Sequence, residues 1–414
     1  MKQGKKTVLN GSHWGIFRAD VEDGRVVRVH PFEKDPAPTP LIHTIPSITH
    51  TETRISQPMV RAGYHANGPD SDRTKRGAEP FVKVSWDEAL DLVAGELSRV
   101  KTDHGNQAIF AGSYGWGGPG KFQRAKNHLH RMLNMWGGFT GSTSSYSFAA
   151  GMIIVPHILG SLQPIWGPHT SWASLEQACG LLVSFGGLPA KNMQIDHGGS
   201  VHTAEGWLKR IKESGTEFVN IGPNRGDMAN FLDALWLPAR PGSDTAIMLA
   251  LAHTLYAEGL HDQGFLARYC VGFEAFLPYL TGADDGQPKD ADWAAPICEV
   301  DGDTIRALAR RMAATRTMIN ISWSVQRADR GEQPFWMGAV LAAMLGQIGL
   351  PGAGISYGYG VEGSNGNPHT PLPAPGVASG QNPSGSIIPC ARISDMLLEP
   401  SGEYDFNGQH LTYP

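Results

Sequence analysis

The chain has 414 residues, of which 41% are hydrophobic and 18% charged, with a formal net charge of -5. Because a single hydrophobic core stops growing at roughly 250 to 300 residues, this length predicts two or three cores and excludes one small module. The negative charge offers no basic surface for nucleic acid or an anionic membrane, so the composition favours a small-molecule ligand.

The four cysteines are scattered and form no CxxC pair, which argues against a disulfide framework, a zinc site or an iron–sulfur cluster. The first residues contain neither the apolar run of a signal peptide nor a twin arginine, and no apolar run reaches the roughly 18 residues that a membrane span needs. We therefore expect a cytoplasmic protein without a membrane span, or a periplasmic one if an export signal has been removed.

The N-terminal part predicts a small β region followed by a helix. Residues 14–30 alternate apolar and polar side chains around Asp23-Gly24, which is a strong hairpin signal. Residues 33–80 show no clear period and predict a long surface segment. Ser85 and Glu88 form a capping-box pattern at the start of a helix with apolar residues at helical spacing.

The middle of the chain predicts an α/β fold. Short apolar runs at 108–112, 181–186, 217–221 and 317–322 are each followed by a helical pattern, near 121–136, 203–213, 244–259 and 334–348. Such alternation is typical of parallel sheets with crossover helices. After residue 350 the sequence is rich in glycine and proline and predicts little core, and the last residues predict a hairpin around Asn407-Gly408. The chain stops at Pro414 as though truncated.

The glycine-rich segment at 108–122 has two interpretations. Gly115 to Lys121 fits GxxxxGK, but Phe122 stands where a P-loop needs Ser or Thr for magnesium, so a nucleotide-binding enzyme is the weaker one. The second interpretation is that the segment is only a tight connection between a strand and a helix. Tyr114 and Trp116 are large side chains in this turn, where they would either face a ligand crevice and donate hydrogen bonds or simply pack.

Three further segments carry candidate site residues. Ser147 lies in a cluster of hydroxyl side chains, which is usually turn chemistry, and no GxSxG motif surrounds it. Arg225 follows a predicted strand, and Asp244 opens a helix, where NH groups could bind phosphate and the carboxylate could accept from a guanine edge. The alternative is that Ser243 or Asp244 only caps that helix. Polar residues including Gln326 follow another strand end.

Taken together, the chain resembles the molybdopterin oxidoreductases of the dimethyl sulfoxide, trimethylamine-N-oxide and biotin sulfoxide reductase group. Seven segments carry the resemblance, in order and nearly end to end: SHWGIFRADVEDGRVVRVHPF, RGAEPFVKVSWDEALDLVA, SYGW, GGFTGSTSSYSFAAG, ARPGSDTAIMLALAHTL, QR…GEQPFW and MLGQIGLPGAG. The implied fold is an N-terminal small β region plus parallel-sheet α/β domains of the dimethyl sulfoxide reductase type, truncated at the C-terminus. The implied division is 1–50, then 51–165 continued by 330–414, with 166–329 as an inserted dinucleotide-binding domain.

The resemblance also implies a cofactor and its contacts. In that family a molybdenum ion is held by two molybdopterin guanine dinucleotides and one protein side chain, whose position in the motif falls on Ser147, with no cysteine nearby in the sequence. It implies Tyr114, Trp116 and Ser147 as catalytic residues, the first two as hydrogen-bond donors to the transferred oxygen. The implied cofactor contacts are Trp116, Ser147, Lys191, Arg225, Asp244, Gln326 and Arg327.

The implied function is reduction of an S-oxide or N-oxide by oxygen-atom transfer, with a cytochrome or a soluble reductant as electron donor. Because family members continue well beyond Pro414, a separate chain is one source for the C-terminal half. The alternatives are an inactive truncated fragment that lacks the C-terminal cofactor-binding domain and, less favoured, the P-loop-like nucleotide-binding enzyme.

Overall fold

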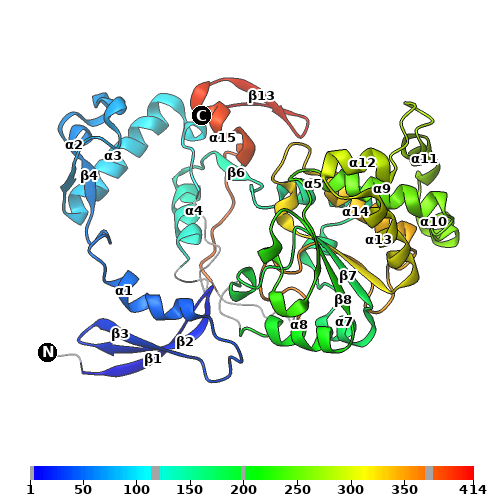
Figure 1. The fold of residues 1–414 in the computed structure, drawn as a ribbon. Coiled ribbons are helices and arrows are strands. Elements are labelled where there is room, and N and C mark those ends of the chain that lie inside the picture. Colours follow the sequence, from blue (N-terminus) through cyan, green and yellow to red (C-terminus); the bar gives the residue numbers. More distant parts are fainter. Residues whose placement is uncertain (1–3, 113–121, 123, 197–200, 369–375) are drawn as a thin grey trace.

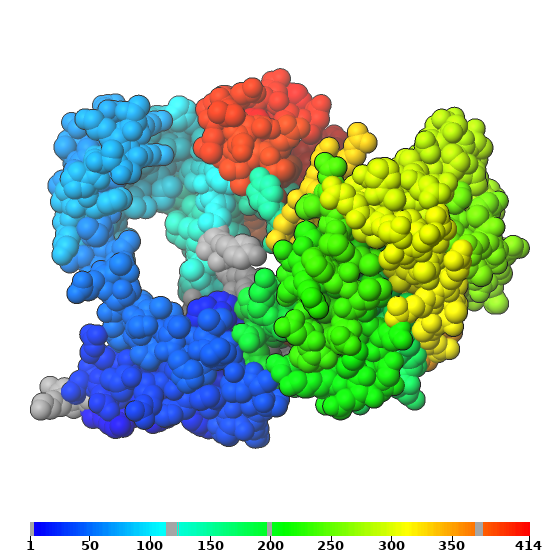
Figure 2. Space-filling model, in the orientation of Figure 1, coloured from blue at the N-terminus to red at the C-terminus, as the bar shows by residue number. Residues whose placement is uncertain are grey.

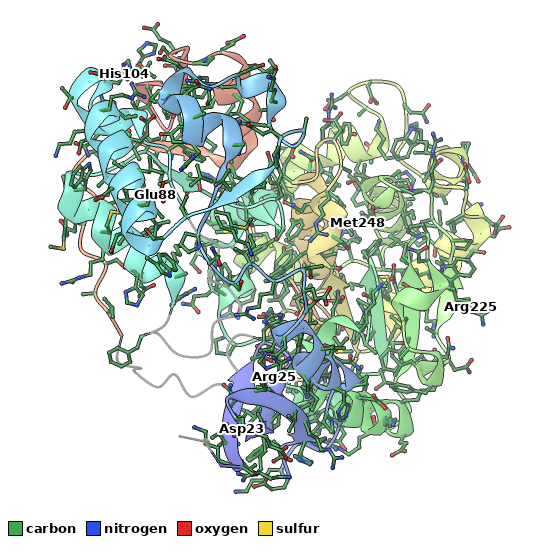
Figure 3. The ribbon with its side chains drawn as sticks, turned by 90° about the vertical axis from the view of Figure 1, so that its left-hand side faces the viewer. Asp23, Arg25, Glu88, His104, Arg225 and Met248 are labelled. Atoms are coloured by element: carbon green, nitrogen blue, oxygen red, sulfur yellow. The ribbon has the colours of Figure 1, made fainter. Side chains whose placement is uncertain are left out.

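The computed structural model describes residues 4–112, 122, 124–196, 201–368 and 376–414. Its N-terminal part is a three-stranded antiparallel sheet of β1 (Lys6–Ser12), β2 (Gly15–Glu22) and β3 (Arg25–Pro31). The predicted hairpin is confirmed, because Asp23 and Gly24 join β2 to β3 with positive φ angles of 49° and 83°. Asp23 and Arg25 mark its tip in Figure 3. The sequence reading missed β1, which pairs with β2 along its whole length.

The predicted long segment after β3 contains short elements and then one long helix. Ser85 caps that helix as predicted, since its Oγ accepts a hydrogen bond of 3.1 Å from the backbone N–H of Glu88. The Glu88 carboxylate does not return to the cap but bonds His65 Nε2 at 2.8 Å. The elements are α1 (Ile45–Thr49), β4 (Met59–Arg61), α2 (Ala62–Asn67), β5 (Phe81–Lys83) and α3 (Trp86–His104), with 3₁₀-helices η1 (Pro40–Thr44), η2 (Gly68–Asp70), η3 (Arg73–Lys75) and η4 (Asn106–Ala108).

The apolar face of α3 is buried only toward its C-terminal end. There, Leu97 and Val100 pack with a small core formed by Ile109, Leu133 and Phe139. At the other end Trp86, Leu90 and Val93 are 69%, 59% and 55% exposed. Glu88 and His104 lie toward the two ends of this helix in Figure 3.

A five-stranded parallel sheet organises the body of the molecule (Figure 1). Its strand order is β11-β10-β7-β8-β9, and every neighbouring pair is parallel. The structure confirms the predicted strands near 181, 217 and 317. The strands are β7 (Leu181–Phe185), β8 (Glu217–Ile221), β9 (Leu235–Leu237), β10 (Thr317–Ile321) and β11 (Gly354–Ser356). β11 pairs with β10 in this sheet, although the predicted division places residues 330–414 with residues 51–165.

Helices cover both faces of this sheet, which explains why all five residues of β7 are buried. Leu181, Val183 and Phe185 belong to the core on one face, whereas Leu182 belongs to the core on the other. The first face packs against α5 (Ala149–Leu159), α9 (Asp244–Ala257), α12 (Ala291–Cys298), α13 (Gly302–Ala314) and α14 (Gln333–Met344); the second packs against α7 (Trp172–Ala178) and α8 (Ala204–Glu213).

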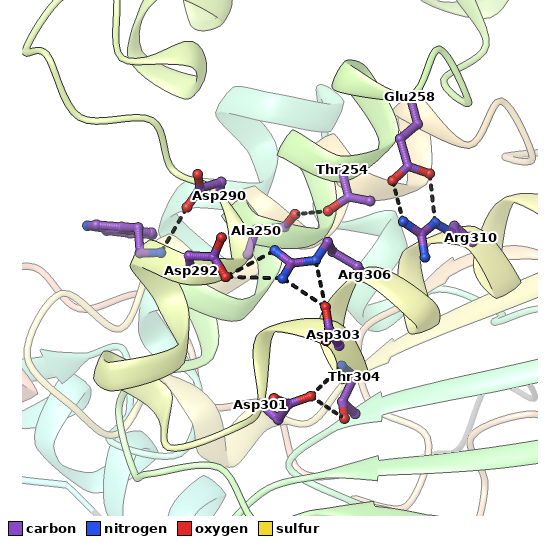
Figure 4. Close-up of polar contacts among 11 residues, drawn as sticks. Ala250, Thr254, Glu258, Asp290, Asp292, Asp301, Asp303, Thr304, Arg306 and Arg310 are labelled. Atoms are coloured by element: carbon purple, nitrogen blue, oxygen red, sulfur yellow. Dashed lines mark hydrogen bonds and ion pairs between the residues drawn. The ribbon is translucent and has the colours of Figure 1, made fainter.

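Ion pairs lie on the outside of this helical layer (Figure 4). Arg306 of α13 bonds Asp292 of α12 at 3.1 Å, and Arg310 of α13 bonds Glu258 beyond α9 at 2.7 Å. The exposed fractions of these four side chains range from 28% to 76%, so each pair contributes little to the stability of the fold. The buried α9, on which Figure 3 marks Met248, supplies most of the packing. Two further helices, α10 (Gln263–Tyr269) and α11 (Phe273–Thr281), complete this layer.

The first part of the glycine-rich segment after residue 350, residues 352–366, is largely buried, which corrects the expectation that it would form little core. Residues 376–386 of the same segment are exposed or half-buried, as that expectation implied. Tyr357 and Tyr359 are fully buried. Gly360 has φ +80°, and a Cβ there would lie 2.8 Å from Leu188 Cα. The expectation failed because it counted apolar side chains, whereas here the absence of side chains lets the backbone pass close to the loop after β7.

Of the remaining elements, α4 (Ala125–Trp136) and β6 (Gly141–Thr143) lie between α3 and the body, and the C-terminal hairpin lies above them in Figures 1 and 2. The predicted hairpin around Asn407-Gly408 is confirmed. The predicted strand at 108–112 is only a single parallel bridge between Phe110 and Thr140. The other elements are α6 (Gln163–Trp166), β12 (Ile387–Pro389), α15 (Ile393–Leu398), β13 (Glu403–Phe406) and β14 (Gln409–Thr412).

A buried contact joins the N-terminal region to the body. His202 Nδ1 lies 2.7 Å from the Asp35 carboxylate, and the His202 backbone N–H donates to the same carboxylate at 3.0 Å. The other ring nitrogen of His202 lies 3.0 Å from the Gln194 carbonyl oxygen.

Among the described residues, no helix combines the length and the apolar character that crossing a bilayer requires.

Candidate functional site

Ser147 lies in the turn of residues 144–148, between β6 and the first residue of α5. We call these residues the serine turn. Their conformation departs from regular structure, since Ser144 has φ +66° and Phe148 has φ -165° and ψ 29°. A positive φ at a serine is uncommon and needs support from the surrounding structure.

Gln326, from a distant part of the sequence, bonds the serine turn on either side of Ser147. Its side-chain Oε1 accepts a hydrogen bond of 2.7 Å from the Ala150 backbone N–H, and its Nε2 donates to the Tyr146 backbone carbonyl at 2.9 Å. Gln326 ends the 3₁₀-helix η8 (Trp323–Gln326), which follows β10. The contacts with Tyr146 and Ala150 therefore bracket Ser147.

Two further contacts fix the serine turn. The Phe148 ring stacks on Trp323, with centroids 3.7 Å apart and planes inclined by 18°, and Trp166 meets both rings edge-on. The Tyr146 hydroxyl donates to the Cys390 carbonyl at 2.8 Å, just beyond β12, which pairs with β6. Both neighbours of Ser147 are thus anchored to segments far away in the sequence.

Ser147 itself is partly buried, and no hydrogen bond joins its hydroxyl to another described residue. Tyr114 and Trp116, predicted as its catalytic partners, lie outside the described residues, as do Gly115 to Lys121 of the P-loop-like pattern. The structure therefore places the predicted metal ligand but leaves its relation to these two aromatic residues as a prediction.

An open cavity of about 850 Å³ lies beside the serine turn. Ser144, Ser145 and Tyr146 of the turn line it together with apolar side chains of α5 and Phe406, whereas Ser147 is not one of its lining residues. Ser145 Oγ is buried without a hydrogen-bond partner among the described residues. Cys390 also lines the cavity, so the expectation that no cysteine lies near Ser147 holds only along the sequence. Burial raises the pKa of the Cys390 thiol, so without a bound metal ion the thiol is protonated at neutral pH.

The other predicted contacts lie along one edge of the five-stranded sheet. Gln326 and Arg327 follow β10, Lys191 follows β7, Arg225 follows β8, and Asp244 follows β9. Because these four strands are parallel neighbours, their carboxyl ends bring the residues to the same edge, in that order. The chain changes direction across the sheet between β7 and β10, and such a switch point is where open α/β sheets bind ligands.

The loops after β7 and β8 contact each other at this edge. The Leu188 backbone N–H donates to the Asp227 carbonyl at 2.7 Å, and Lys191 Nζ lies 3.8 Å from the Asp227 carboxylate. Arg225 is exposed in the 3₁₀-helix η6 (Arg225–Asp227), as Figure 3 shows. Two cationic side chains thus border the middle of the edge.

Asp244 is the first residue of α9, and the preceding Ser243 does not cap the helix with its side chain. Ser243 Oγ instead donates to the Arg240 carbonyl at 2.6 Å, which excludes the capping role considered for Ser243. Burial raises the pKa of Asp244 to about 6. A carboxylate whose charge is disfavoured in this way gains from a ligand that donates hydrogen bonds to it.

The sequence reading missed a row of buried polar residues just before this edge. Asn320, Ser184 and Asn220 occupy matching positions of β10, β7 and β8. Asn320 Nδ2 donates to Ser184 Oγ at 2.8 Å, and its Oδ1 accepts from the Tyr359 backbone N–H at 3.0 Å. Asn220 Oδ1 is buried without a partner among the described residues. The sequence could have revealed this row, because each of the three strands has a polar residue at its second-last position.

Comparisons with known proteins show which families and relatives this chain resembles. Residues 54–382 match the family model described as molybdopterin oxidoreductase, and residues 10–50 match that of the molybdopterin oxidoreductase N-terminal domain. Biotin sulfoxide reductase of Cereibacter sphaeroides is 47% identical over 93% of this chain and 52% of that protein. The dimethyl sulfoxide/trimethylamine N-oxide reductase of the same organism is 44% identical over 98% of this chain and 51% of that protein.

A third relative and one solved structure extend the comparison. Trimethylamine-N-oxide reductase of Pasteurella multocida is 40% identical over 98% of this chain and 51% of that protein. The chain therefore spans about half the length of the curated relatives it matches. The structure of acetylene hydratase from Pelobacter acetylenicus superposes with a TM-score of 0.54 and 22% identity, over 82% of this chain and 42% of that one, which shows the fold alone.

Proposed function

This chain belongs to the molybdopterin oxidoreductase family, and from that premise we propose that it reduces an S-oxide or N-oxide at a molybdenum centre held by Ser147. The observation that carries the proposal is the serine turn. Its neighbours are anchored on both sides, while the Ser147 hydroxyl makes no hydrogen bond to another described residue. When bound, the molybdenum centre supplies the two-electron chemistry that removes the oxygen atom from the substrate.

The chain's own contribution begins with the oxygen of Ser147. A deprotonated serine is a hard ligand that suits the higher oxidation state of a metal otherwise held by soft sulfur atoms. A ligand on an anchored turn needs little reorganisation when the metal changes its oxidation state. Ile153, Ile154 and Phe406 line the adjoining open cavity and would contact the apolar part of a small organic substrate.

We also propose that the edge of the five-stranded sheet holds the cofactor in its guanine dinucleotide form. From β10 to β9 the edge covers three strand spacings, about 14 Å. Lys191 and Arg225 lie between the two ends and would face the phosphates, and Asp244 at the far end would accept hydrogen bonds from the guanine.

The backbone at this edge fits a bulky ligand. Gly186 and Gly222 directly follow β7 and β8, so both strands end without a side chain. A Cβ on Gly222 would lie 3.8 Å from Gly186 Cα and would partly fill the space between the two turns. Close approach of backbone to a pyrophosphate is the usual reason for glycine at such strand ends.

The substrate class, electron donor and location are part of this proposal. The relatives are named for biotin sulfoxide, dimethyl sulfoxide and trimethylamine N-oxide, which share an oxygen atom bound to a sulfur or nitrogen atom. We propose the same class here, with a cytochrome or a soluble reductant as donor, in the cytoplasm. Cell fractionation checks the location, and recovery of the protein in the periplasmic fraction would contradict it.

The experiment that tests the function uses the full-length product of the gene, purified from cells grown with molybdate or with tungstate. We expect molybdenum and guanine nucleotide to copurify, and reduced viologen to be oxidised by at least one of the three oxides only in the molybdate preparation. A protein that contains molybdenum and reduces none of them overturns the proposed activity. A protein without guanine nucleotide overturns the dinucleotide form alone.

A further inference from the structure

We propose that Gln326 is a positioning residue for Ser147, acting by bonding the two backbone groups that one more turn of α5 would join. This inference rests on the proposed function, because it assigns Ser147 its role. The resemblance implies Gln326 as a cofactor contact, and that role stays a prediction. The contacts that the structure records for its side chain are made with the backbone of the serine turn and α5.

The spacing of the two partners of Gln326 explains its effect. In an α-helix the N–H of each residue donates to the carbonyl four residues earlier, so Ala150 N–H and Tyr146 C=O are the pair that one more turn of α5 would join. The Gln326 amide is inserted between them, accepting from the first and donating to the second. The helix therefore begins at Ala149 instead of at Ser147, and Ser147 stays in the turn.

The element that carries Gln326 is itself fixed. The Trp323 indole N–H donates to the Tyr357 carbonyl at 3.0 Å, and the Trp323 ring stacks on Phe148. Closing the extra helical turn would also require Phe148 to leave its φ of -165° and its place on Trp323. Loss of the Gln326 amide alone would thus leave the Tyr146 and Ala150 backbone groups without these partners and the serine turn mobile.

The chain offers a closely matched control at the other end of β10. Gln347 Oε1 accepts from the Thr317 backbone N–H at 2.7 Å, and its Nε2 donates to the Thr315 carbonyl at 2.9 Å. These are the same bond types and distances as those of Gln326, and both glutamines are partly buried. Gln347 lies at the amino end of the strand, away from Ser147, so Gln347→Leu measures the general cost of losing such a pair.

The test compares Gln326→Leu with Gln347→Leu in the full-length, cofactor-loaded protein. We expect hydrogen–deuterium exchange of the Ala150 amide to be about tenfold faster in Gln326→Leu than in Gln347→Leu, since one protecting bond is lost. We also expect kcat to fall about tenfold with KM within twofold, while both variants lose similar thermal stability. Exchange no faster in Gln326→Leu than in Gln347→Leu overturns the inference.

A Ser147→Ala variant separates failure of this inference from failure of the proposed function. If Ser147→Ala perturbs the Mo(V) resonance signal while Gln326→Leu behaves like Gln347→Leu, the positioning role is wrong and the ligand assignment stands. If Ser147→Ala leaves the signal unchanged while Gln326→Leu still accelerates exchange at Ala150, the ligand assignment is wrong and Gln326 only stabilises the turn.

Discussion

Ser147 stands between two residues, Tyr146 and Phe148, that are both held by contacts with distant segments of the chain. Tyr146 is bonded through both its hydroxyl and its carbonyl, and Phe148 is stacked, so the backbone on either side of Ser147 has little freedom. The hydroxyl group between them carries no such contact with the described residues. Fixing a ligand in advance reduces the entropy lost when the metal binds, which is the physical advantage of this arrangement.

Asp244 gives a prediction about pH. Burial raises its folded-state pKa to about 6, above the ordinary value of 3.8. A carboxyl whose pKa is raised by folding contributes stability below about pH 4, and this contribution is lost as pH rises to 6. Without bound cofactor, Asp244→Asn should therefore be more stable than the native protein at pH 7.5, by roughly 1 to 2 kcal/mol, and equally stable at pH 4.

Urea unfolding of the cofactor-free protein at the two pH values measures this difference. Glu205→Gln is a suitable control, because Glu205 is an exposed residue of α8 that pairs with Lys209 on the surface. An Asp244→Asn variant whose stability differs from the native value by the same amount at pH 4 and pH 7.5 would show that burial does not disfavour the charge of Asp244.

The position of a site residue at the sheet could be predicted only where that residue follows a predicted strand. Lys191 and Arg225 each follow a predicted strand, so their arrival at one edge could be expected, whereas Asp244 follows β9, a strand that was not predicted. Gln326 also follows a strand, but its bonds to Tyr146 and Ala150 cross 180 and 176 residues and no local pattern encodes them. The proximity of Cys390 to the serine turn depends in the same way on the pairing of β12 with β6.

At the level of elements, the predicted strands of the central sheet were confirmed because each is a continuous apolar run that is buried on both faces. The glycine-rich segment after 350 was misjudged for the opposite reason. Its contribution to the core comes from close backbone approach and from two buried tyrosines, neither of which appears as a periodic pattern.

Gly360 allows this account of the glycine-rich segment to be tested. Its φ of +80° is unfavourable for other residues, and a Cβ would meet the Leu188 backbone. Gly360→Ala should lower the free energy of unfolding by about 2 to 4 kcal/mol. Gly206→Ala on α8 is the control, because nothing lies within 4 Å of its added Cβ. There we expect no loss, or a gain of about 0.5 to 1 kcal/mol. Equal effects of the two changes in chemical denaturation would contradict the account.

At the scale of the whole molecule, the Asp35–His202 contact links the N-terminal region to the body. Both side chains are buried, and Asp35 accepts two hydrogen bonds from His202. Asp35→Ala should cost about 3 kcal/mol, because it leaves two buried donors without their acceptor. Asp405→Ala, which removes the partner of His410 in an exposed pair, should have little effect.

Limited proteolysis adds a spatial readout to the Asp35 comparison. In Asp35→Ala we expect faster cleavage between the N-terminal sheet and the body at a protease level that leaves Asp405→Ala intact. If both variants unfold and are cleaved like the native protein, this contact does not hold the N-terminal region in place.

The order of the seven segments along the chain carried the family assignment further than any single element did. Each of the seven segments alone fits several folds, whereas their sequence order resembles one family, and the family models match 54–382 and 10–50. The packing around the serine turn could not be predicted from the sequence, because α5, η8 and β12 meet there from distant parts of the chain.

The most direct test of Ser147 as the metal ligand is X-ray absorption at the molybdenum edge of three cofactor-loaded variants of the full-length protein, Ser147→Cys, Ser142→Cys and Cys390→Ser. We predict that Ser147→Cys replaces one oxygen neighbour of molybdenum by sulfur, while Ser142→Cys, on the exposed side of β6, and Cys390→Ser leave the native spectrum unchanged. A native spectrum in Ser147→Cys, or the loss of a sulfur neighbour in Cys390→Ser, would contradict the assignment.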